Sequence, residues 1–171
     1  YRREGLLGPH VRRLVPDADL TVSDLAPEMR DRALRRLEGE HGQGDVRGLV
    51  LDAEAPEAAG GGYDLICSSL SMQWFTDRAA TLARLAAMLA PGGMMAFSTL
   101  CDGSFDEWRL VHAAAGQDCA IPAYPTPERL AEDWPRVGQG FWEVETILDR
   151  PGTALAFVRE LRQIGASLPR E

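Results

Sequence analysis

Two aspartates follow short segments that contain Leu and Val, and their positions predict nucleotide chemistry. Asp24 follows residues 20–23, and Asp52 follows residues 46–51. Both segments are typical of short strands. In open α/β sheets, ligands bind outside the carboxyl ends of the strands. A carboxylate there can accept hydrogen bonds from both hydroxyl groups of a ribose, and Asp24 fits that role. The alternative for Asp24 is an acid that caps the following helix, and the alternative for Asp52 is an acid in a solvated turn.

A strand–loop–helix–strand unit lies in the middle of the chain. The sequence predicts a buried strand at residues 63–68, a polar loop that ends in Trp74, and a helix over residues 77–89 with an aspartate cap. A Pro-Gly-Gly stop at residues 91–93 precedes an almost wholly apolar segment at residues 94–100. Such a segment is expected of a central parallel strand that is covered on both faces.

The remaining patterns extend this unit into a single domain over residues 1–171. Further helices are predicted at residues 6–14, 27–38, 105–115, 127–134 and 153–164, and a further strand at residues 141–148. Pro27 and Pro127 suit the first helical position, the second of them after a Thr126 cap. The alternation of strands and helices predicts an α/β fold with a parallel sheet.

Composition excludes several functions. The net charge is −8, and all 18 basic residues are Arg, a bias we attribute to GC-rich coding, so nucleic acid is not an expected partner. No apolar run approaches the roughly 20 residues that a membrane helix needs, and no signal-peptide pattern begins the chain, so we expect a cytoplasmic protein. The three cysteines and three histidines have no ligand spacing, so no metal is expected.

Residues 63–74 and 89–99 together resemble the fourth and fifth strands of class I S-adenosylmethionine-dependent methyltransferases, a Rossmann-like class. Within that class they are most similar to the malonyl-[acyl-carrier-protein] O-methyltransferases of biotin synthesis. Residues 22–29 resemble the second-strand motif of the family, and residues 161–167 resemble its Leu-Lys-x-Ile-Gly-Ala-Asn stretch. The resemblance implies a sheet with helices on both faces and S-adenosylmethionine as cofactor. It also implies that residues 101–140 form a helical insertion on the substrate side.

The resemblance implies roles for named residues, beginning with the ribose contact of Asp24. Met29 would pack on the adenosine, although simple core filling would also explain it. Trp74 would line the reaction pocket, and a core position is the alternative. The implied cofactor-binding residues are Asp24, Leu25, Met29, Asp52, Ala53, Ser68, Ser69 and Leu70, and the implied substrate residues are Gln73, Trp74, Ser98 and Thr99.

Two parts of the family pattern are absent from these 171 residues. The glycine-rich loop after the first strand, that strand itself and the last strand have no counterpart. Because the first strand lies between the second and fourth in the family's sheet, we expect the physical polypeptide to be longer. The second departure is an Arg expected to hold the malonyl carboxylate, which residues 119–126 do not contain. Arg109 and Arg129 are the alternatives that the sequence offers.

The function implied is methyl transfer to an oxygen acceptor, the free carboxylate of a small-molecule or acyl-carrier-protein-linked malonyl thioester. A carboxylate is already a nucleophile, so no catalytic acid or base is expected, and the protein would supply alignment and exclusion of water. Two alternatives stay open. One is a methyltransferase-like assembly factor of the respiratory complex I type, and the other is a dehydrogenase that uses a dinucleotide.

Overall fold

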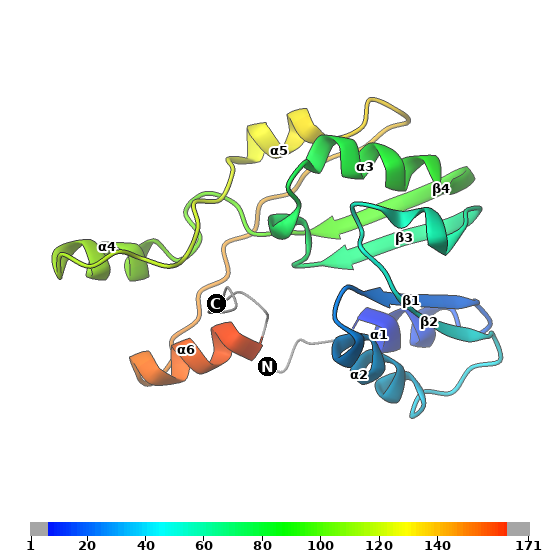
Figure 1. Ribbon diagram of the computed structural model, residues 1–171, viewed down its shortest axis with the longest axis horizontal. Helices are drawn as coiled ribbons and strands as arrows, with labels where there is room; N and C mark the ends of the chain where they lie inside the picture. Colours follow the sequence, from blue (N-terminus) through cyan, green and yellow to red (C-terminus); the bar gives the residue numbers. More distant parts are fainter. Residues whose placement is uncertain (1–6, 164–171) are drawn as a thin grey trace.

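Parallel strands in two pairs form the centre of the computed structural model, which describes residues 7–163 (Figure 1). Strand β1 (Leu20–Asp24) pairs with β2 (Val46–Val50), and β3 (Tyr63–Ser69) pairs with β4 (Leu89–Ser98). The predicted α/β fold with parallel strands is confirmed. The strands form two sheets and not one continuous sheet, because within residues 7–163 no strand bridges β1 and β3.

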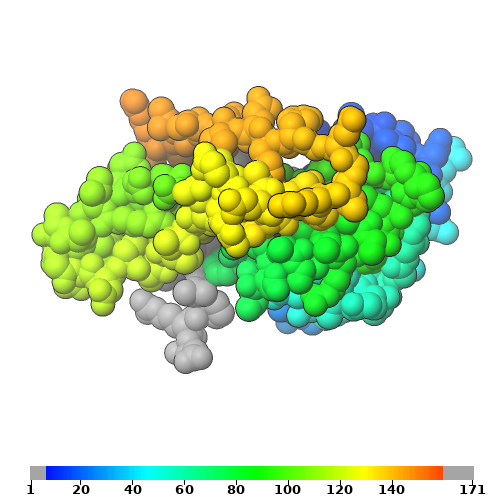
Figure 2. Space-filling model, turned by 90° about the horizontal axis from the view of Figure 1, so that it is seen from above, coloured from blue at the N-terminus to red at the C-terminus, as the bar shows by residue number. Residues whose placement is uncertain are grey.

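The helices cover these sheets from different sides. In Figure 1, α1 and α2 lie against β1 and β2, whereas α3 lies over β3 and β4 with α5 beside it. Figure 2 shows α5 and the segment that follows it lying over the region of α3 and β4. The helices are α1 (Leu7–Leu14), α2 (Pro27–Leu37), α3 (Arg78–Ala87), α4 (Asp106–Ala114), α5 (Pro127–Asp133) and α6 (Ala154–Gln163), with 3-10 turns η1 (Pro56–Ala59) and η2 (Met72–Trp74).

Sequence signals set the helix starts. Pro27 and Pro127 occupy the first positions of α2 and α5, as predicted, since a missing N–H costs nothing there. The Oγ1 atom of Thr126 accepts a hydrogen bond from Arg129 N at 3.3 Å. The Oδ1 atom of Asp77 accepts one from Ala80 N at 3.0 Å, which confirms the predicted cap of α3.

Removing the α3 cap is expected to destabilise the protein modestly. Asp77→Ala leaves the Ala80 N–H without its acceptor, so we expect a loss of about 1 kcal/mol in the free energy of unfolding. Urea denaturation measures this loss. Asp77→Asn is the matched control, because its amide oxygen can still accept the bond. Equal losses in the two variants would show that the hydrogen bond is not the cause.

Two predicted features of the strands are wrong. Residues 141–148 form no strand but an irregular segment in which Phe141 is 89% exposed, because no described strand lies alongside to pair with it. Residues 94–98 of β4 alternate between exposed and half-buried, and Met94 is 61% exposed. One face of this strand is therefore covered and the other is not, contrary to the expected burial on both faces.

The Pro-Gly-Gly segment, predicted to separate the helix from the next strand, instead lies inside β4, where it interrupts the strand pairing. Tyr63 pairs with Leu89 and Leu65 pairs with Met94, so four residues of β4 lie opposite one residue of β3. Pro91 lacks the N–H that a ladder requires, and Gly92 has a φ of 82°, which favours glycine. The ladder is regular from Met94 onwards.

The core under α5 holds the second sheet and its helices together. Met72 and Leu82 are fully buried and Leu130 of α5 is nearly so. Phe97 and Trp134 pack against this group, with their rings edge to face and 6.0 Å apart. In the part of the chain described here, no helix is long and apolar enough to cross a bilayer.

A buried arginine ties α1 to the first sheet. Arg12 is 2% exposed, and its guanidinium donates hydrogen bonds to three backbone carbonyls, those of Pro16 (2.6 Å), Ala18 (2.9 Å) and Gly44 (2.9 Å). These acceptors come from the connection before β1 and from the loop before β2. The side chain therefore fixes both loops that enter the first sheet.

Candidate active site

The two predicted nucleotide-binding acids lie at the carboxyl ends of the paired strands β1 and β2, Asp24 as the last residue of β1 and Asp52 in the turn after β2. Asp24 pairs in register with Val50, and Leu51 N donates a hydrogen bond to Asp24 O at 3.1 Å. The Oδ1 atom of Asp24 accepts from Ala26 N at 2.8 Å, and Oδ1 of Asp52 accepts from Glu54 N at 2.9 Å. Each turn thus uses one carboxylate oxygen, and the second has no hydrogen-bond partner among residues 7–163.

The apolar residues predicted beside these acids differ in exposure. Leu25 is 68% exposed directly after Asp24, whereas Met29 is half-buried in the first turn of α2. Ala53 is half-buried in the turn after Asp52. An exposed leucine beside a carboxylate offers an apolar surface next to a polar acceptor, which suits a nucleoside.

Hydroxyl groups gather at the carboxyl ends of β3 and β4. Ser69 and Ser98 are register partners, and their Oγ atoms are 2.9 Å apart. The Oγ atoms of Ser68 and Ser71 are 2.5 Å apart. A cavity of about 300 Å³ opens beside them, lined by Leu7, Cys67, Ser68, Ser69, Ala96, Phe97 and Ser98. The structure thus brings three predicted site residues to one cavity, and the other predicted residues lie outside its lining.

Leu70 adopts a backbone conformation that is rare for leucine. Its φ is 58°, in the left-handed region, and its N–H donates to Ser98 O at 2.8 Å. A non-glycine residue in this region costs on the order of 1–3 kcal/mol and is found at functional loops. The conformation turns the chain sharply at the end of β3, at the place where the sequence predicts cofactor contact.

The predicted substrate residues lie on η2 and after β4. Thr99 Oγ1 donates to Gln73 Oε1 at 3.3 Å, which joins the two segments. The Nε2 atom of Gln73 is buried and has no partner among the described residues. Trp74 is 38% exposed, so it is not a core residue, contrary to the alternative raised by its sequence context.

Glu54 is a residue that sequence reasoning missed. Its Oε1 atom accepts hydrogen bonds from Thr76 N (2.9 Å), Asp77 N (3.0 Å) and Thr81 Oγ1 (3.4 Å). Its backbone carbonyl accepts one from Arg84 Nη1 at 2.8 Å. An acid two positions after Asp52 was the available signal, but only the fold reveals that its partners lie on α3.

The Glu54 carboxylate makes a pH-dependent contribution to stability. The hydrogen bond from the Asp77 N–H, followed by those from Thr76 and Thr81, lowers the pKa of Glu54 below its ordinary value. A group with a lowered pKa in the folded state stabilises that state above its unfolded pKa and loses the contribution as pH falls through the folded value.

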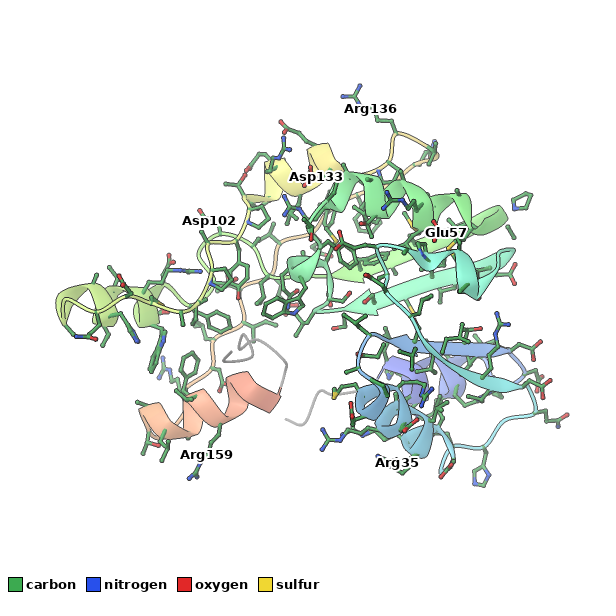
Figure 3. All side chains as sticks on the ribbon, viewed as in Figure 1. Arg35, Glu57, Asp102, Asp133, Arg136 and Arg159 are labelled. Atoms are coloured by element: carbon green, nitrogen blue, oxygen red, sulfur yellow. The ribbon has the colours of Figure 1, made fainter. Side chains whose placement is uncertain are left out.

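We therefore expect Glu54→Gln to lower the melting temperature at pH 7 and to lose this effect at acidic pH. The reason is that wild-type Glu54 becomes neutral there too. Melting curves at several pH values measure the difference. Glu57→Gln is the matched control, because the carboxylate of Glu57 (labelled on η1 in Figure 3) accepts no hydrogen bond from the described residues. A difference between wild type and Glu54→Gln that stays constant with pH would contradict the prediction.

Cys67 lies in the lining of the cavity, a position that the sequence analysis did not predict. Burial raises the pKa of its thiol above the ordinary value, so the thiol stays protonated at neutral pH. It therefore contributes apolar surface and not a nucleophile. Among residues 7–163, no three Cys, His, Asp or Glu side chains converge as metal ligands would.

The two arginines considered for a substrate carboxylate are engaged elsewhere. Arg109 donates to the carbonyls of Ser104 and Pro122, at 2.5 and 2.6 Å, and lies over the Tyr124 ring. Arg129 pairs with Glu132 at 2.8 Å and with Asp133 at 3.3 Å. Asp133, shown in Figure 3 between α5 and α3, also binds Arg78 at 2.8 Å. Both candidate arginines thus stabilise the region after β4.

The donor set fits S-adenosylmethionine at this edge. A carboxylate oxygen of Asp24 is available for ribose hydroxyls, and one of Asp52 is available for an amino group. Serine hydroxyls and the strained Leu70 backbone follow β3, where the methionine end would lie. Acceptors for the nucleoside and hydroxyls for the polar tail are the chemistry that this cofactor requires.

Comparisons with known proteins identify the family to which the chain belongs. The profile of a family described as "Methyltransferase domain" matches residues 3–95. The chain is 40% identical over 166 residues to the biotin biosynthesis bifunctional protein BioCD of Bordetella avium, covering 97% of the chain and 34% of that relative. It is 36% identical to the malonyl-[acyl-carrier protein] O-methyltransferase of Magnetococcus marinus and 31% identical to that of Pseudescherichia vulneris.

The second and third alignments cover 96% and 88% of the chain, and 60% and 57% of the relatives. The chain therefore spans about a third to three-fifths of the length of these relatives. The family resemblance predicted from the sequence is confirmed.

Proposed function

Because the chain belongs to the methyltransferase domain family, we propose that it serves in methyl transfer from S-adenosylmethionine to an oxygen acceptor, the free carboxylate of a malonyl thioester. The observation that carries the proposal is the pair of carboxylates at the carboxyl ends of β1 and β2, each with one oxygen available, together with the hydroxyl cluster at the carboxyl ends of β3 and β4. The acceptor class comes from the two relatives that are malonyl-[acyl-carrier protein] O-methyltransferases.

The cofactor would supply a methyl group on a positively charged sulfur. Asp24 would accept hydrogen bonds from its ribose, with Leu25 and Met29 beside the adenosine. Asp52 would accept from the adenine amino group, and the Ala53 N–H would donate to the ring. Ser68, Ser69 and Leu70 would hold the methionine end through the turn after β3.

The acceptor side would consist of Gln73, Trp74, Ser98 and Thr99. A carboxylate needs no general base, so these residues would orient it and exclude water. The buried Gln73 Nε2 has a hydrogen to donate, which a carboxylate or carbonyl oxygen could accept. Residues 101–140 are proposed to complete the acceptor side, because Leu130 of α5 belongs to the buried group that contains Met72 of η2, and Cys101 packs against that group.

The engaged arginines favour a second candidate. If neither Arg109 nor Arg129 can leave its partners, no cation from this region holds the malonyl carboxylate. A methyltransferase-like assembly factor of the respiratory complex I type, without methyl transfer to malonyl thioesters, would need no such cation. A dehydrogenase is disfavoured by the family match.

Calorimetry and a transfer assay separate these candidates. We expect S-adenosylhomocysteine to bind the full polypeptide with micromolar affinity, and labelled methyl from S-adenosylmethionine to appear on malonyl thioester as an alkali-labile ester. Cofactor binding without transfer would support the assembly factor. Preference for NADH over S-adenosylhomocysteine would contradict the methyltransferase proposal.

We further propose that another strand completes the sheet between β1 and β3. The support is physical, since each of these strands keeps one edge without a strand partner within residues 7–163. Unpaired backbone groups at two facing edges are costly. The expected consequence is a native polypeptide heavier than 18.7 kDa, which an intact mass measurement on the protein from its source checks.

A further inference from the structure

Glu54 joins two parts of the candidate site that belong to different sheets. Its backbone N–H binds the Asp52 carboxylate, which fixes the turn after β2. Its side-chain carboxylate binds Thr76 N and Asp77 N, which directly follow the turn that carries Gln73 and Trp74. One residue therefore contacts the nucleotide side through its main chain and the acceptor side through its side chain.

The contacts of Glu54 are made by groups that are themselves well fixed. Thr81 is fully buried, and its single hydroxyl hydrogen is shared between Asp77 O at 2.7 Å and the Glu54 carboxylate at 3.4 Å. Arg84, one turn further along α3, holds the Glu54 carbonyl at 2.8 Å. The loop after β2 is thus attached to α3 at two points, and a shift of α3 would move the loop with it.

Within residues 7–163, side-chain hydrogen bonds also join β2 to the start of β3 and the turn before it, at the opposite ends of the strands. Arg47 of β2 donates to Tyr63 OH at 2.9 Å and to Ala59 O at 2.8 Å. These contacts hold the amino ends of β2 and β3 and leave the carboxyl ends to Glu54. Its carboxylate therefore sets how the two halves of the candidate site lie at the edge where ligands bind.

We propose that Glu54 is a positioning residue for the cofactor, acting by holding the Asp52 loop against the start of α3. The inference rests on the proposed function, because it assigns to Glu54 the alignment of that same site. Loss of the carboxylate removes the attachment of the Asp52 loop to the start of α3, leaving the Arg84 bond to the Glu54 carbonyl and Asp52 itself intact. In a well-aligned site, moving a reacting group by about 1 Å can lower the reaction rate up to about a hundredfold.

The test compares variants that weaken the same helix start in different ways. Glu54→Ala removes the carboxylate link between the loop and the start of α3, whereas Asp77→Ala removes a cap from α3 but keeps both backbone N–H groups that bind Glu54. Calorimetry with S-adenosylhomocysteine is run on each full polypeptide, together with its melting temperature. If Glu54 only stabilised the fold, the variants would bind S-adenosylhomocysteine with equal affinity when each is measured at the same interval below its own melting temperature.

We expect Glu54→Ala to raise the dissociation constant about tenfold. Glu54→Gln, which retains an acceptor oxygen, should raise it about threefold or less, and Asp77→Ala should leave it unchanged. If the alanine variant does not fold, Glu54→Gln still tests the inference, because its dissociation constant must rise more than that of Asp77→Ala. If the wild-type protein and all three variants bind S-adenosylhomocysteine with equal affinity, the inference is overturned and the proposed function still stands. No binding by the wild-type protein would overturn both.

Discussion

Asp24→Asn is expected to weaken S-adenosylhomocysteine binding by about 10- to 100-fold. A hydrogen bond to a charged group contributes roughly 1.5–3 kcal/mol, and a ribose would make two with this carboxylate. The amide oxygen of asparagine can still accept from Ala26 N, so the turn after β1 is expected to keep its shape. Isothermal calorimetry measures the change directly.

Asp19→Asn is the matched control for this prediction. Asp19 precedes β1 at its opposite end, and its Oδ1 atom also accepts a backbone hydrogen bond, from Asp45 N at 2.9 Å. The same chemical change is therefore made at both ends of one strand. We expect the Asp19 variant to bind S-adenosylhomocysteine with wild-type affinity. Wild-type affinity in the Asp24 variant would remove Asp24 from the site.

Leu82→Ala is expected to lower the free energy of unfolding by about 3 kcal/mol. Leu82 is fully buried in α3 between Met72 and Leu130, so truncation loses apolar burial and leaves a cavity. Urea denaturation followed by circular dichroism measures the loss. The magnitude is a large fraction of the stability of an ordinary domain.

Leu110→Ala provides the control, because Leu110 on α4 is 68% exposed. Surface substitutions away from special features change stability by less than about 0.5 kcal/mol. A similar loss in both variants would show that the group around Leu82 is not the core of this half of the protein. Loss of cooperativity in the Leu82 variant alone would show that α5 separates from α3.

Local patterns in the sequence predicted the elements well where each signal acts within a few residues. Asp77, Pro27 and Pro127 mark helix starts because a cap or a missing N–H acts within one turn. The aspartates after β1 and β2 were predicted at strand ends, where the structure places them. Residues 141–148 were predicted incorrectly because alternation indicates that a segment can pair, but pairing requires a neighbouring strand.

The site was harder to predict than the elements. The left-handed φ of Leu70 could not be foreseen, because glycine is the usual signal for that conformation and leucine is not. The contacts of Glu54 join positions 22 to 27 residues apart, and no periodicity connects them. The engagement of Arg109 by carbonyls 5 and 13 residues away likewise depends on the path of the loop after β4.

The three carbonyl acceptors of Arg12 have a consequence for how the protein would come apart in acid. Carbonyl oxygens do not titrate, so acidification leaves the links from α1 to the loops before β1 and β2 intact. The Glu54 carboxylate at the other end of β2 is neutralised under the same conditions. In acid, the protein should therefore open first at the carboxyl end of β2. Hydrogen exchange at low pH should show the amides near Thr76 and Asp77 exchanging with solvent before those near Gly44. The edge that would bind ligands would loosen while the Arg12 links at the opposite edge persist.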